Sequence, residues 1–371
     1  MASVAVLGSG IVGTAAAWDM GRRGYDVLVA DREREAAFGA AAIADARAAV
    51  VDATDEAAVR GLLDGVDLVV SGVPYALGES VARTAVETET HYLDFGGNPT
   101  IVRRQLELDS AAIAAGVTVV PDCGLAPGMV NVLAVGVADA LGEGPIDELR
   151  LRVGALPAHP VGALGYQLAF SPAGLINEYA ESCEVLRDGA FALVEPLTGI
   201  EAVPWEPFGT LQAFHTAGGS SSLPTMFAGR VGELDYKTLR HAGHAEAFRA
   251  MLEIGLFDET PQLGSGVAPR TVLLEALADH LPAGSDDLVL MRVWARRGNV
   301  TRGYEMADRN DTRFSALART TAFPATALAH LILEGRAEPG SRTMDGAITA
   351  ANLIEELQPV DVRVVEYSPE A

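Results

Sequence analysis

The sequence predicts an α/β protein in which a doubly wound parallel sheet is joined to a second, α+β domain. Three observations support this fold class. Short apolar runs alternate with helical patterns six times between Val4 and Pro121, as they do when helices connect the strands of a parallel sheet. From about Glu148 the apolar runs lengthen, and helical patterning returns near Phe314. The chain of 371 residues is also long enough for two hydrophobic cores.

The first element is the apolar run Val4–Leu7, which has the composition of a buried parallel strand. An Ala-rich stretch from Ile11 to about Arg23 follows and is predicted to be helical. Tyr25–Ala30 is predicted to be a second strand, which ends at Asp31. This order of elements is typical of the β–turn–α–β unit that binds dinucleotides.

Three glycines in the turn, Gly8, Gly10 and Gly13, form the pattern G-x-G-x-x-G. Gly8 permits a tight turn, Gly10 lets a pyrophosphate approach the backbone, and Gly13 lets helix and strand pack closely. The N-terminus of the helix then faces the phosphates. Glycines alone are weak evidence in a glycine-rich chain, but the strand before them and the acid after them make the motif specific. The sequence therefore predicts a Rossmann dinucleotide-binding domain.

Asp31 lies where it can accept hydrogen bonds from the ribose diol of the cofactor. A carboxylate about 4 Å from a 2′-phosphate would cost up to about 4 kcal/mol per charge pair at a surface-like dielectric. The sequence therefore favours NAD over NADP. Arg32 leaves the alternative open, because a neighbouring guanidinium could accept the phosphate.

Four further strands complete the predicted sheet, and the carboxyl ends of all six should form one ligand-binding edge. These strands are Val50–Ala53, Asp67–Val73, His91–Gly97 and Thr118–Pro121, with helices at Ala76–Glu87 and Ile101–Ala115. The predicted cofactor-binding residues are Gly8, Ser9, Gly10, Ile11, Val12, Gly13, Asp31, Asp52, Val73, Pro74 and Asn98.

The rest of the chain is predicted to form a substrate and dimerisation domain and a return to the nucleotide domain. We expect the nucleotide domain at residues 1–128, the second domain at 129–314, and the return at 315–371. Its elements are a helix at Met129–Leu141, antiparallel strands at Glu148–Val153 and Leu288–Ala295, helices at Ala316–Gly335 and Asp345–Gln358, and a last strand around Val360–Val365.

The composition excludes several classes of partner. A net charge of −23 argues against nucleic acid and anionic membranes. No apolar run reaches the length that spans a membrane, and the N-terminus leads directly into a strand, so we expect a cytoplasmic protein. The two cysteines, Cys123 and Cys183, fit a reducing compartment and have no spacing typical of a metal site.

Asp122 and Cys123 follow the sixth strand, at the edge where a nicotinamide would lie. Asp122 could bind a substrate ammonium or accept its proton, and Cys123 could pack against the ring or act in acid–base catalysis. The alternatives are a turn-capping Asp and a small buried Cys. Lys237 is the single lysine among 27 basic residues. It is either a chance remnant or a candidate base, because Lys can lose its proton when partly buried and Arg cannot.

Polar residues of the middle region are candidates for binding a substrate amine and carboxylate. Glu178 could hold an amine, although a solvated or interface position is an alternative. The loop Phe214–Pro224 could bind a carboxylate or be a plain surface loop, and Arg230 could supply positive charge or form a surface ion pair. Ser171 could be a helix N-cap. The predicted substrate-binding residues are Tyr166, Glu178, His215, Thr216, Ser220 and Arg230.

Several of these segments resemble the saccharopine dehydrogenase-like superfamily, over nearly the whole chain. They are GSGIVG with Asp31, HYLDFGGN, VVPDCGLAPGMVN, LGYQLAFSPAGLINEY, and HTAGGSSSLP followed by LDYKTLRHAGH. PDCGLAPGM is shared by several members, whereas GYQLAFSPAGLINEY together with LDYKTLRHAGH is similar to the lysine 6-dehydrogenase branch.

The resemblance implies NAD-dependent oxidative deamination of L-lysine at Cε by a homodimer. The products are a 6-semialdehyde, which cyclises to a piperideine carboxylate, with ammonia and NADH. The hypothesis places the substrate near Asp122, with Lys237 or Asp122 as base. Two alternatives stay open: a reductive condensing dehydrogenase of the saccharopine or carboxynorspermidine type, and a non-catalytic NAD(H)-sensing module.

Overall fold

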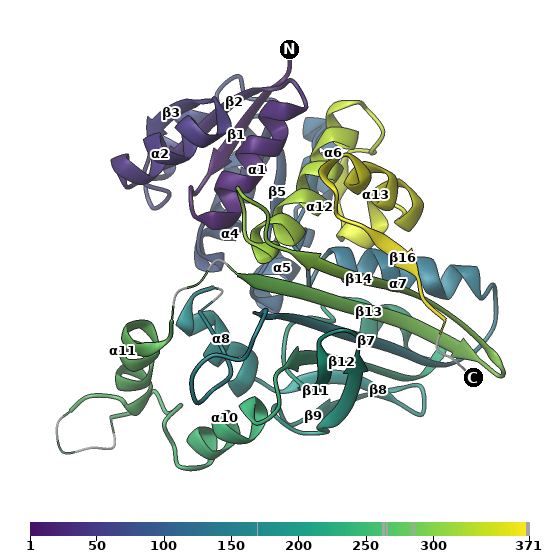
Figure 1. Ribbon diagram of the computed structural model, residues 1–371. Helices are drawn as coiled ribbons and strands as arrows, with labels where there is room; N and C mark the ends of the chain where they lie inside the picture. The colour runs from purple at the N-terminus through teal and green to yellow at the C-terminus, as the bar shows by residue number, and fades with distance from the viewer. Residues whose placement is uncertain (169, 262–263, 265, 283, 285, 369–371) are drawn as a thin grey trace. The chain divides into compact units, whose positions relative to one another are not determined.

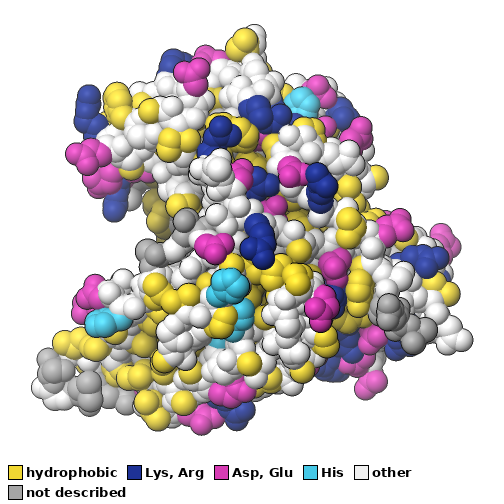
Figure 2. Space-filling model, viewed as in Figure 1, with side chains coloured by type: hydrophobic (Ala, Val, Ile, Leu, Met, Phe, Trp, Pro, Cys, Tyr) yellow, Lys and Arg dark blue, Asp and Glu magenta, His cyan; other side chains and the backbone are white. Residues whose placement is uncertain are grey.

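The chain forms two compact units in a computed structural model, shown in Figure 1. The structure describes all residues except 169, 262–263, 265, 283, 285 and 369–371. Unit 1 contains Met1–Gly136 and Ala318–Arg363, and unit 2 contains Val137–Leu317 and Val364–Ala371. Each unit is therefore built from two separate stretches of the chain. On the face shown in Figure 2, acidic and basic side chains are interspersed rather than gathered in one patch.

Unit 1 contains a seven-stranded sheet in which every pair of neighbouring strands is parallel. Its strands are β1 (Ser3–Leu7), β2 (Asp26–Asp31), β3 (Arg47–Val50), β4 (Leu68–Ser71), β5 (His91–Asp94), β6 (Thr118–Val120) and β15 (Gly340–Ser341). The order β15-β6-β5-β4-β1-β2-β3 reverses direction between β1 and β4, which is where nucleotides bind in doubly wound sheets. The predicted fold class is confirmed.

Helices cover both faces of this sheet (Figure 1). They are α1 (Ile11–Arg22), α2 (Arg34–Ala44), α3 (Glu56–Leu63), α4 (Gly78–Glu87), α5 (Pro99–Leu106), α6 (Asp109–Ala115) and α13 (Ala350–Leu357), with 3₁₀ turns at Tyr75–Leu77, Met344–Gly346 and Gln358–Val360. Two helices, α7 (Met129–Ala140) and α12 (Ala316–Leu333), run across the boundaries of the units. Apolar residues of α3, α4 and α6 pack on alternate residues of the strands, such as Leu7, Val69 and Val119.

Two elements of unit 1 differ from the sequence prediction. The third strand covers Arg47–Val50, and only Val50 lies in the predicted range. It stops there because its neighbour β2 ends at Asp31, and because Asp52 begins a turn in which its carbonyl accepts from the Asp55 amide at 3.0 Å. The predicted long helix is divided into α5 and α6, and the left-handed Gly116 ends the second of them.

Helix α12 is long and apolar enough to cross a membrane by length and composition alone, contrary to the expectation from the sequence. However, 78% of that stretch is buried inside the structure. The Thr326 hydroxyl donates to the buried Asp19 carboxylate at 2.6 Å, and the Phe323 ring lies 6.0 Å from that of Trp18. These are the contacts of a helix in a protein core.

Unit 2 contains a nine-stranded mixed sheet with the order β10-β11-β12-β7-β13-β14-β16, and β8 and β9 extend it beside β12. Its strands are β7 (Ile146–Pro157), β8 (Cys183–Arg187), β9 (Ala190–Val194), β10 (Glu201–Trp205), β11 (Gly209–His215), β12 (Val231–Arg240), β13 (Asp287–Arg297), β14 (Val300–Arg309) and β16 (Val364–Glu366). The β7–β13 pair is antiparallel as predicted, whereas β7 and β12 are parallel. The last strand, β16, pairs with β14, so the predicted return to the nucleotide domain does not include it.

Four helices accompany this sheet: α8 (Pro172–Ala180), α9 (Leu223–Phe227), α10 (His244–Glu253) and α11 (Pro269–His280). Apolar residues of α8, α10 and α11 form one core with Phe214 of β11. The Ser171 hydroxyl accepts from the Gly174 amide at 3.1 Å and caps α8. Ser171 is therefore the helix cap that the sequence suggested.

Candidate functional site

The turn between β1 and α1 has the geometry that each of its glycines was expected to provide. Gly8 has φ +99°, a conformation that favours glycine. A Cβ on Gly13 would lie 2.0 Å from the Gly8 carbonyl oxygen, so only glycine fits there. A Cβ on Gly10 would meet nothing within 4 Å. The protein therefore leaves open space at the one glycine where a pyrophosphate should approach.

The start of α1 offers free donors at this space. No side chain caps the helix at Gly10, and no acidic residue lies in its first turn. Ile11 is 54% exposed although it is a large apolar residue, and Val12 is half-buried. An uncapped helix N-terminus attracts anions through its N–H groups and dipole, so these residues fit a dinucleotide phosphate.

Asp31 is held at the edge of this turn by three hydrogen bonds. Its carboxylate accepts from the Ser9 amide and the Ser9 hydroxyl, both at 2.8 Å, and from the Glu33 amide at 3.0 Å. Partial burial opposes ionisation, but these hydrogen bonds, with Arg32 nearby, lower the pKa of Asp31 below its usual value. Asp31 is therefore a fixed anion beside the glycine turn.

The other predicted cofactor residues lie at loops after β3, β4 and β5. Asp52 is exposed, and its carboxylate accepts from the Thr54 amide and hydroxyl at 2.9 and 2.8 Å. Val73 is half-buried and Pro74 exposed, next to Gly72, whose carbonyl oxygen would lie 2.7 Å from a Cβ on Gly8. The loop after β4 therefore meets the glycine turn closely.

Asn98 has a structural role that the sequence did not reveal. Its side-chain oxygen accepts from the Thr100 and Ile101 amides at 2.9 and 3.2 Å and caps α5. Only its amide nitrogen could therefore donate to a ligand, and cofactor binding by Asn98 stays a prediction.

A buried carboxylate that the sequence analysis missed, Asp94, organises the loops after β5 and β6. Its Oδ1 accepts from the amides of Gly96 and Asp122 at 2.8 and 3.0 Å. Its Oδ2 accepts from the Tyr92 hydroxyl and the Gln105 side chain at 2.8 and 2.6 Å. Four donors therefore converge on one side chain, which fixes the backbone at Asp122.

The carboxylate of Asp122 lies against Gly96. Asp122 has φ +59°, and a Cβ on Gly96 would lie 1.9 Å from its Oδ1. Gly96 itself has φ +78°, so both residues have left-handed backbone conformations that place them together. The glycine pair at Gly96 and Gly97 directly after Asp94 was the sequence signal for this arrangement.

Cys123 is fully buried, and its thiol donates to the Val120 carbonyl at 3.2 Å. Burial raises the pKa of the Cys123 thiol well above its usual value, and the carboxylates of Asp94 and Asp122 raise it further. A neutral, enclosed thiol is a poor proton acceptor. The structure therefore argues against the acid–base role considered for Cys123 and assigns it to packing.

In unit 2 the two faces of β11 and β12 divide the predicted substrate residues into two sets. Phe214 pairs with Thr238, and His215 pairs with Lys237. Since neighbouring residues of a strand point to opposite faces, His215 and Lys237 lie on the face opposite to Thr238. The sequence analysis had grouped them in one site.

The face with Thr238 carries most of the predicted substrate-binding residues. The hydroxyls of Thr216 and Thr238 are 2.7 Å apart. The Tyr236 ring packs on Gly219, where a Cβ would lie 2.3 Å from the ring, and Ser220 follows as a buried residue. Arg240, two residues beyond Thr238, is 3% exposed. The pattern Tyr-x-Thr-x-Arg on one strand was the sequence signal for this set, and it was missed.

Glu178 of α8 interacts electrostatically with this set. Burial raises the pKa of the half-buried Glu178 carboxyl to about 7, and the Arg240 guanidinium opposes the shift. The Glu178 carboxyl in turn raises the pKa of Tyr236, adding to the effect of burial. The backbone carbonyl of Glu178 accepts from the Ala217 amide at 3.0 Å, which joins α8 to the predicted substrate loop.

Aromatic rings lie beside the same residues. The Tyr166 ring is 5.1 Å from the Arg240 guanidinium and 5.1 Å from the His244 ring. His244 donates from Nδ1 to the Leu164 carbonyl at 3.0 Å, so its Nε2 accepts from the Tyr179 hydroxyl at 2.9 Å. Burial lowers the pKa of His244 to about 3, and Arg240 adds to this effect. Tyr166 thus packs in a neutral aromatic group.

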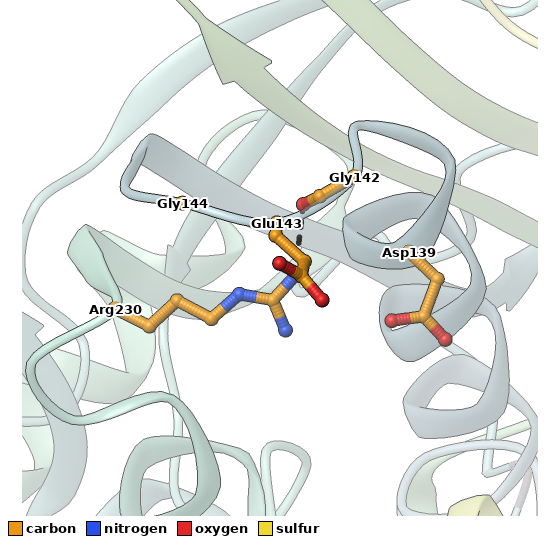
Figure 3. Close-up of a pocket in the computed structure, with 5 residues that line it drawn as sticks. All are labelled: Asp139, Gly142, Glu143, Gly144 and Arg230. Carbon is orange, nitrogen blue, oxygen red and sulfur yellow. Dashed lines mark hydrogen bonds between the residues drawn. The ribbon is translucent and has the colours of Figure 1, made fainter.

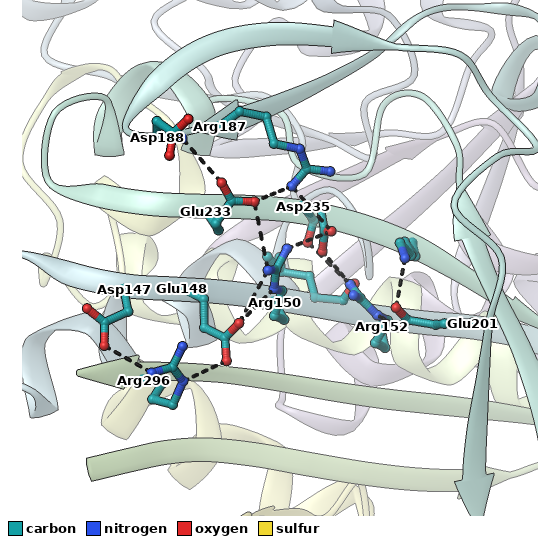
Figure 4. Close-up of polar contacts among 12 residues, drawn as sticks. Asp147, Glu148, Arg150, Arg152, Arg187, Asp188, Glu201, Glu233, Asp235 and Arg296 are labelled. Carbon is teal, nitrogen blue, oxygen red and sulfur yellow. Dashed lines mark hydrogen bonds and ion pairs between the residues drawn. The ribbon is translucent and has the colours of Figure 1, made fainter. Parts of the chain in front are cut away.

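Lys237 pairs with Glu201 and so joins an ion-pair network on the opposite face of the sheet. Figure 4 shows Arg152, Glu201 and Asp235 of this network. Its ammonium donates to the Gly199 carbonyl at 2.6 Å and to Glu201 at 2.7 Å. Glu201 also pairs with Arg152, whose guanidinium binds Asp235 at 2.7 Å. The Lys237 side chain is thus already engaged by a carboxylate and a backbone carbonyl on the face opposite to Thr238, which does not favour Lys237 as the general base.

His215 lies on the same face and is also unsuited to its predicted role. Burial lowers the pKa of His215 to about 4, with Asp235 opposing the shift. The imidazole is therefore neutral near pH 7 and cannot supply positive charge to a carboxylate. In the described part of the chain its buried Nδ1 has no hydrogen-bond partner.

We predict that Lys237→Met destabilises the protein but leaves the pH dependence of turnover unchanged. Removing one partner of a buried ion pair should lower the free energy of unfolding by about 3 kcal/mol, measured by urea denaturation. A loss of kcat of about 100-fold or more with normal stability would instead restore the catalytic role. Arg187→Met, which removes a half-exposed ion pair with Glu233, is the matched control.

Arg230 lies away from these residues, in a pocket of about 410 Å³. Figure 3 shows its side chain directed toward the loop after α7, where its Nη2 donates to the Gly142 carbonyl at 3.3 Å. The other lining residues include Asp139 and Glu143. Two acids make this a poor place for a substrate carboxylate, so the structure does not support the predicted role of Arg230.

The parallel sheet, the glycine turn and the fixed Asp31 together define a Rossmann-type dinucleotide-binding unit. The model of the saccharopine dehydrogenase NADP binding domain matches residues 4–120, and that of the saccharopine dehydrogenase C-terminal domain matches residues 124–360. The chain belongs to the saccharopine dehydrogenase family.

Individual relatives agree with this assignment. A saccharopine dehydrogenase [NADP(+), L-glutamate-forming] from Pyricularia oryzae is 27% identical over 269 residues, which are 70% of this chain and 59% of the relative. The mitochondrial alpha-aminoadipic semialdehyde synthase of Mus musculus is 26% identical over 219 residues, 55% of this chain and 22% of the relative. The chain thus spans less than two thirds of the length of each of these proteins.

Among solved structures, the fold is similar to that of apo saccharopine dehydrogenase (L-Glu forming) from Saccharomyces cerevisiae. The TM-score is 0.81 with 18% identity, and the match covers 99% of this chain and 100% of that one. This likeness supports the fold of the chain.

Proposed function

We propose that the protein is an NAD-dependent dehydrogenase that oxidatively deaminates L-lysine at Cε. The observation that best supports dehydrogenase activity is the open glycine turn, which leads into the uncapped N-terminus of α1 and lies beside the fixed Asp31. Family membership supports an oxidoreductase of amino acids, since the relatives are named for saccharopine and aminoadipic semialdehyde. The likeness of two unit 2 segments to the lysine 6-dehydrogenase branch favours lysine itself.

Bound NAD would supply the hydride acceptor. The substrate ammonium loses a proton to a protein carboxylate, Cε loses its hydride, and the resulting imine takes up water to release ammonia and the aldehyde. Of the two bases considered, Asp122 is the one we retain, because Lys237 is bound to Glu201. Asp94 would act as a positioning residue, since it holds the backbone amide of Asp122.

The test is NADH formation by the full chain with NAD and a panel of amino acids and diamines. L-Lysine alone should support turnover with equimolar release of ammonia. If lysine gave no NADH but another amine did, the oxidative deamination would stand and lysine would be the wrong substrate. Turnover only with NAD(P)H and an aldehyde plus an amine would favour the reductive condensing alternative, and nucleotide binding without any turnover would favour the NAD(H)-sensing module.

The choice of NAD rests on Asp31, although the matching family model is named for NADP. We predict that Asp31→Asn raises kcat/KM with NADP relative to NAD by about 100-fold, because the carboxylate repels a 2′-phosphate. Steady-state kinetics with both cofactors measure this ratio. Asp64→Asn, which removes an exposed carboxylate at the end of α3, is the control. A wild-type preference for NADP that disappears in Arg32→Ala would overturn the proposal.

A further inference from the structure

The strongest feature without an assigned role is the buried guanidinium of Arg240. Arg240 is 3% exposed, and its Nη1 donates to the Leu239 carbonyl at 2.9 Å. In the part of the chain that the structure describes, its Nε has no hydrogen-bond partner and no carboxylate lies within ion-pair distance. An arginine cannot lose its charge, so burying it without an anion is costly.

The nearest group of opposite sign is Glu178. Its carboxyl interacts electrostatically with Arg240, yet the two do not form an ion pair within 4 Å. Glu178 is half-buried, which leaves it accessible to a solute. The two groups therefore act on each other without forming a direct ion pair.

Neutral side chains accompany Arg240 on this face of the sheet. Thr216 and Thr238 bond to each other at 2.7 Å, and burial raises the pKa of Tyr236 so that its hydroxyl stays protonated. The Tyr166 ring lies below the Arg240 guanidinium at 5.1 Å. A cation and a carboxyl that interact electrostatically beside neutral side chains complement a zwitterion, whose own anion and cation are separated by a single carbon.

We propose that Arg240 and Glu178 bind the α-amino-acid head group of the substrate, Arg240 through the α-carboxylate and Glu178 through the α-ammonium. This inference rests on the proposed function for the identity of the substrate, but it holds for any α-amino acid. It replaces Arg230 and His215 as the carboxylate-binding residues, and it gives the buried guanidinium an anionic partner.

Three ligands distinguish the contact of Arg240 with the α-carboxylate from the contact of Glu178 with the α-ammonium. L-Lysine has both head-group charges, 6-aminohexanoate keeps the carboxylate but lacks the α-amine, and cadaverine lacks the carboxylate. Binding of each to the NAD-loaded full chain is measured by calorimetry, and turnover is measured by NADH formation. Binding of lysine without turnover would count against the proposed reaction alone, whereas turnover that does not depend on Arg240 would count against this inference alone.

Arg240→Met should weaken the binding of lysine and of 6-aminohexanoate by about 100-fold, as expected for loss of a buried charge pair. It should leave the affinity for cadaverine unchanged. Glu178→Gln should weaken the binding of lysine but not the binding of 6-aminohexanoate. Equal weakening of all three ligands by Arg240→Met would make Arg240 purely structural and overturn the proposal. Arg187→Met and Glu233→Gln, which break an ion pair on the other face of the sheet, are the matched controls, and Arg240→Lys should restore part of the affinity.

The pH dependence of the affinity for lysine is a second test of the role of Glu178. The groups that act on the Glu178 carboxyl are Arg240, Tyr236 and Tyr179. Since the raised pKa is about 7, Glu178 ionises as pH rises through that value, and the affinity for lysine should rise with it. Glu178→Gln should abolish this rise while the affinity for 6-aminohexanoate stays independent of pH. A rise that persists in Glu178→Gln would contradict the assignment of the ammonium to Glu178.

Discussion

Gly13→Ala should abolish productive binding of NAD. The new methyl group would lie 2.0 Å from the Gly8 carbonyl oxygen, which is a backbone atom and cannot rotate away. The turn must therefore open, and the N–H groups at the start of α1 move from the phosphates. Losing two charge-assisted hydrogen bonds should cost about 3 kcal/mol or more of binding free energy. The affinity for NAD should therefore fall by about 100-fold. Calorimetric titration with NAD measures the loss.

Two other glycines are matched controls for this substitution. Gly39 lies exposed within α2 with nothing near its Cβ position, so Gly39→Ala should stabilise the protein by about 0.5–1 kcal/mol without affecting NAD. Gly10→Ala should weaken NAD but change stability by no more than about 1 kcal/mol, because its Cβ would meet only the space reserved for the ligand. Normal NAD binding by Gly10→Ala would place the pyrophosphate elsewhere.

Asp94→Ala should destabilise unit 1 by about 4 kcal/mol, since it leaves four buried donors without their acceptor. The Tyr92 hydroxyl has a second carbonyl within reach, that of Gly78 at 3.3 Å, but no such replacement is evident for the amides of Gly96 and Asp122. Urea denaturation monitored by circular dichroism measures the change. Because the Asp122 backbone loses its support, turnover should also fall at temperatures where the variant is folded.

Asp52→Ala is the control for Asp94→Ala, because Asp52 is an exposed acid that also follows a strand of the sheet. Among the described residues its side chain bonds to Thr54 alone, so its loss should cost about 1 kcal/mol at most. Comparable effects of the two substitutions would show that Asp94 is not the centre of this hydrogen-bond group.

The ion-pair network of unit 2 shows why the sequence alone could not separate the single lysine of the chain from the polar residues near it. Lys237 and His215 are close in sequence to Thr216 and Thr238, and all four are polar. Their separation depends on which face of a strand each one occupies, and that depends on the pairing register of β11 with β12. A shift of one residue would exchange the two sets, so spacing along the chain could not assign them.

Local sequence was sufficient for the nucleotide unit. Gly8, Gly10, Gly13 and Asp31 lie within one β–turn–α–β segment, and the geometry of such a turn is fixed by backbone sterics over a few residues. The alternation of strands and helices likewise determined the doubly wound sheet and its ligand-binding edge. The sequence by itself therefore specified the fold class and the geometry of the glycine turn.

Only the tertiary structure decided which side chains meet in the rest of the molecule. Asp94 became important because donors from β5, α5 and the loop after β6 converge on it, and Arg240 because burial removed water from its guanidinium. Both effects arise from contacts between residues far apart in the chain. The energy of a buried charge depends on its surroundings in space, which neighbouring residues in sequence do not determine.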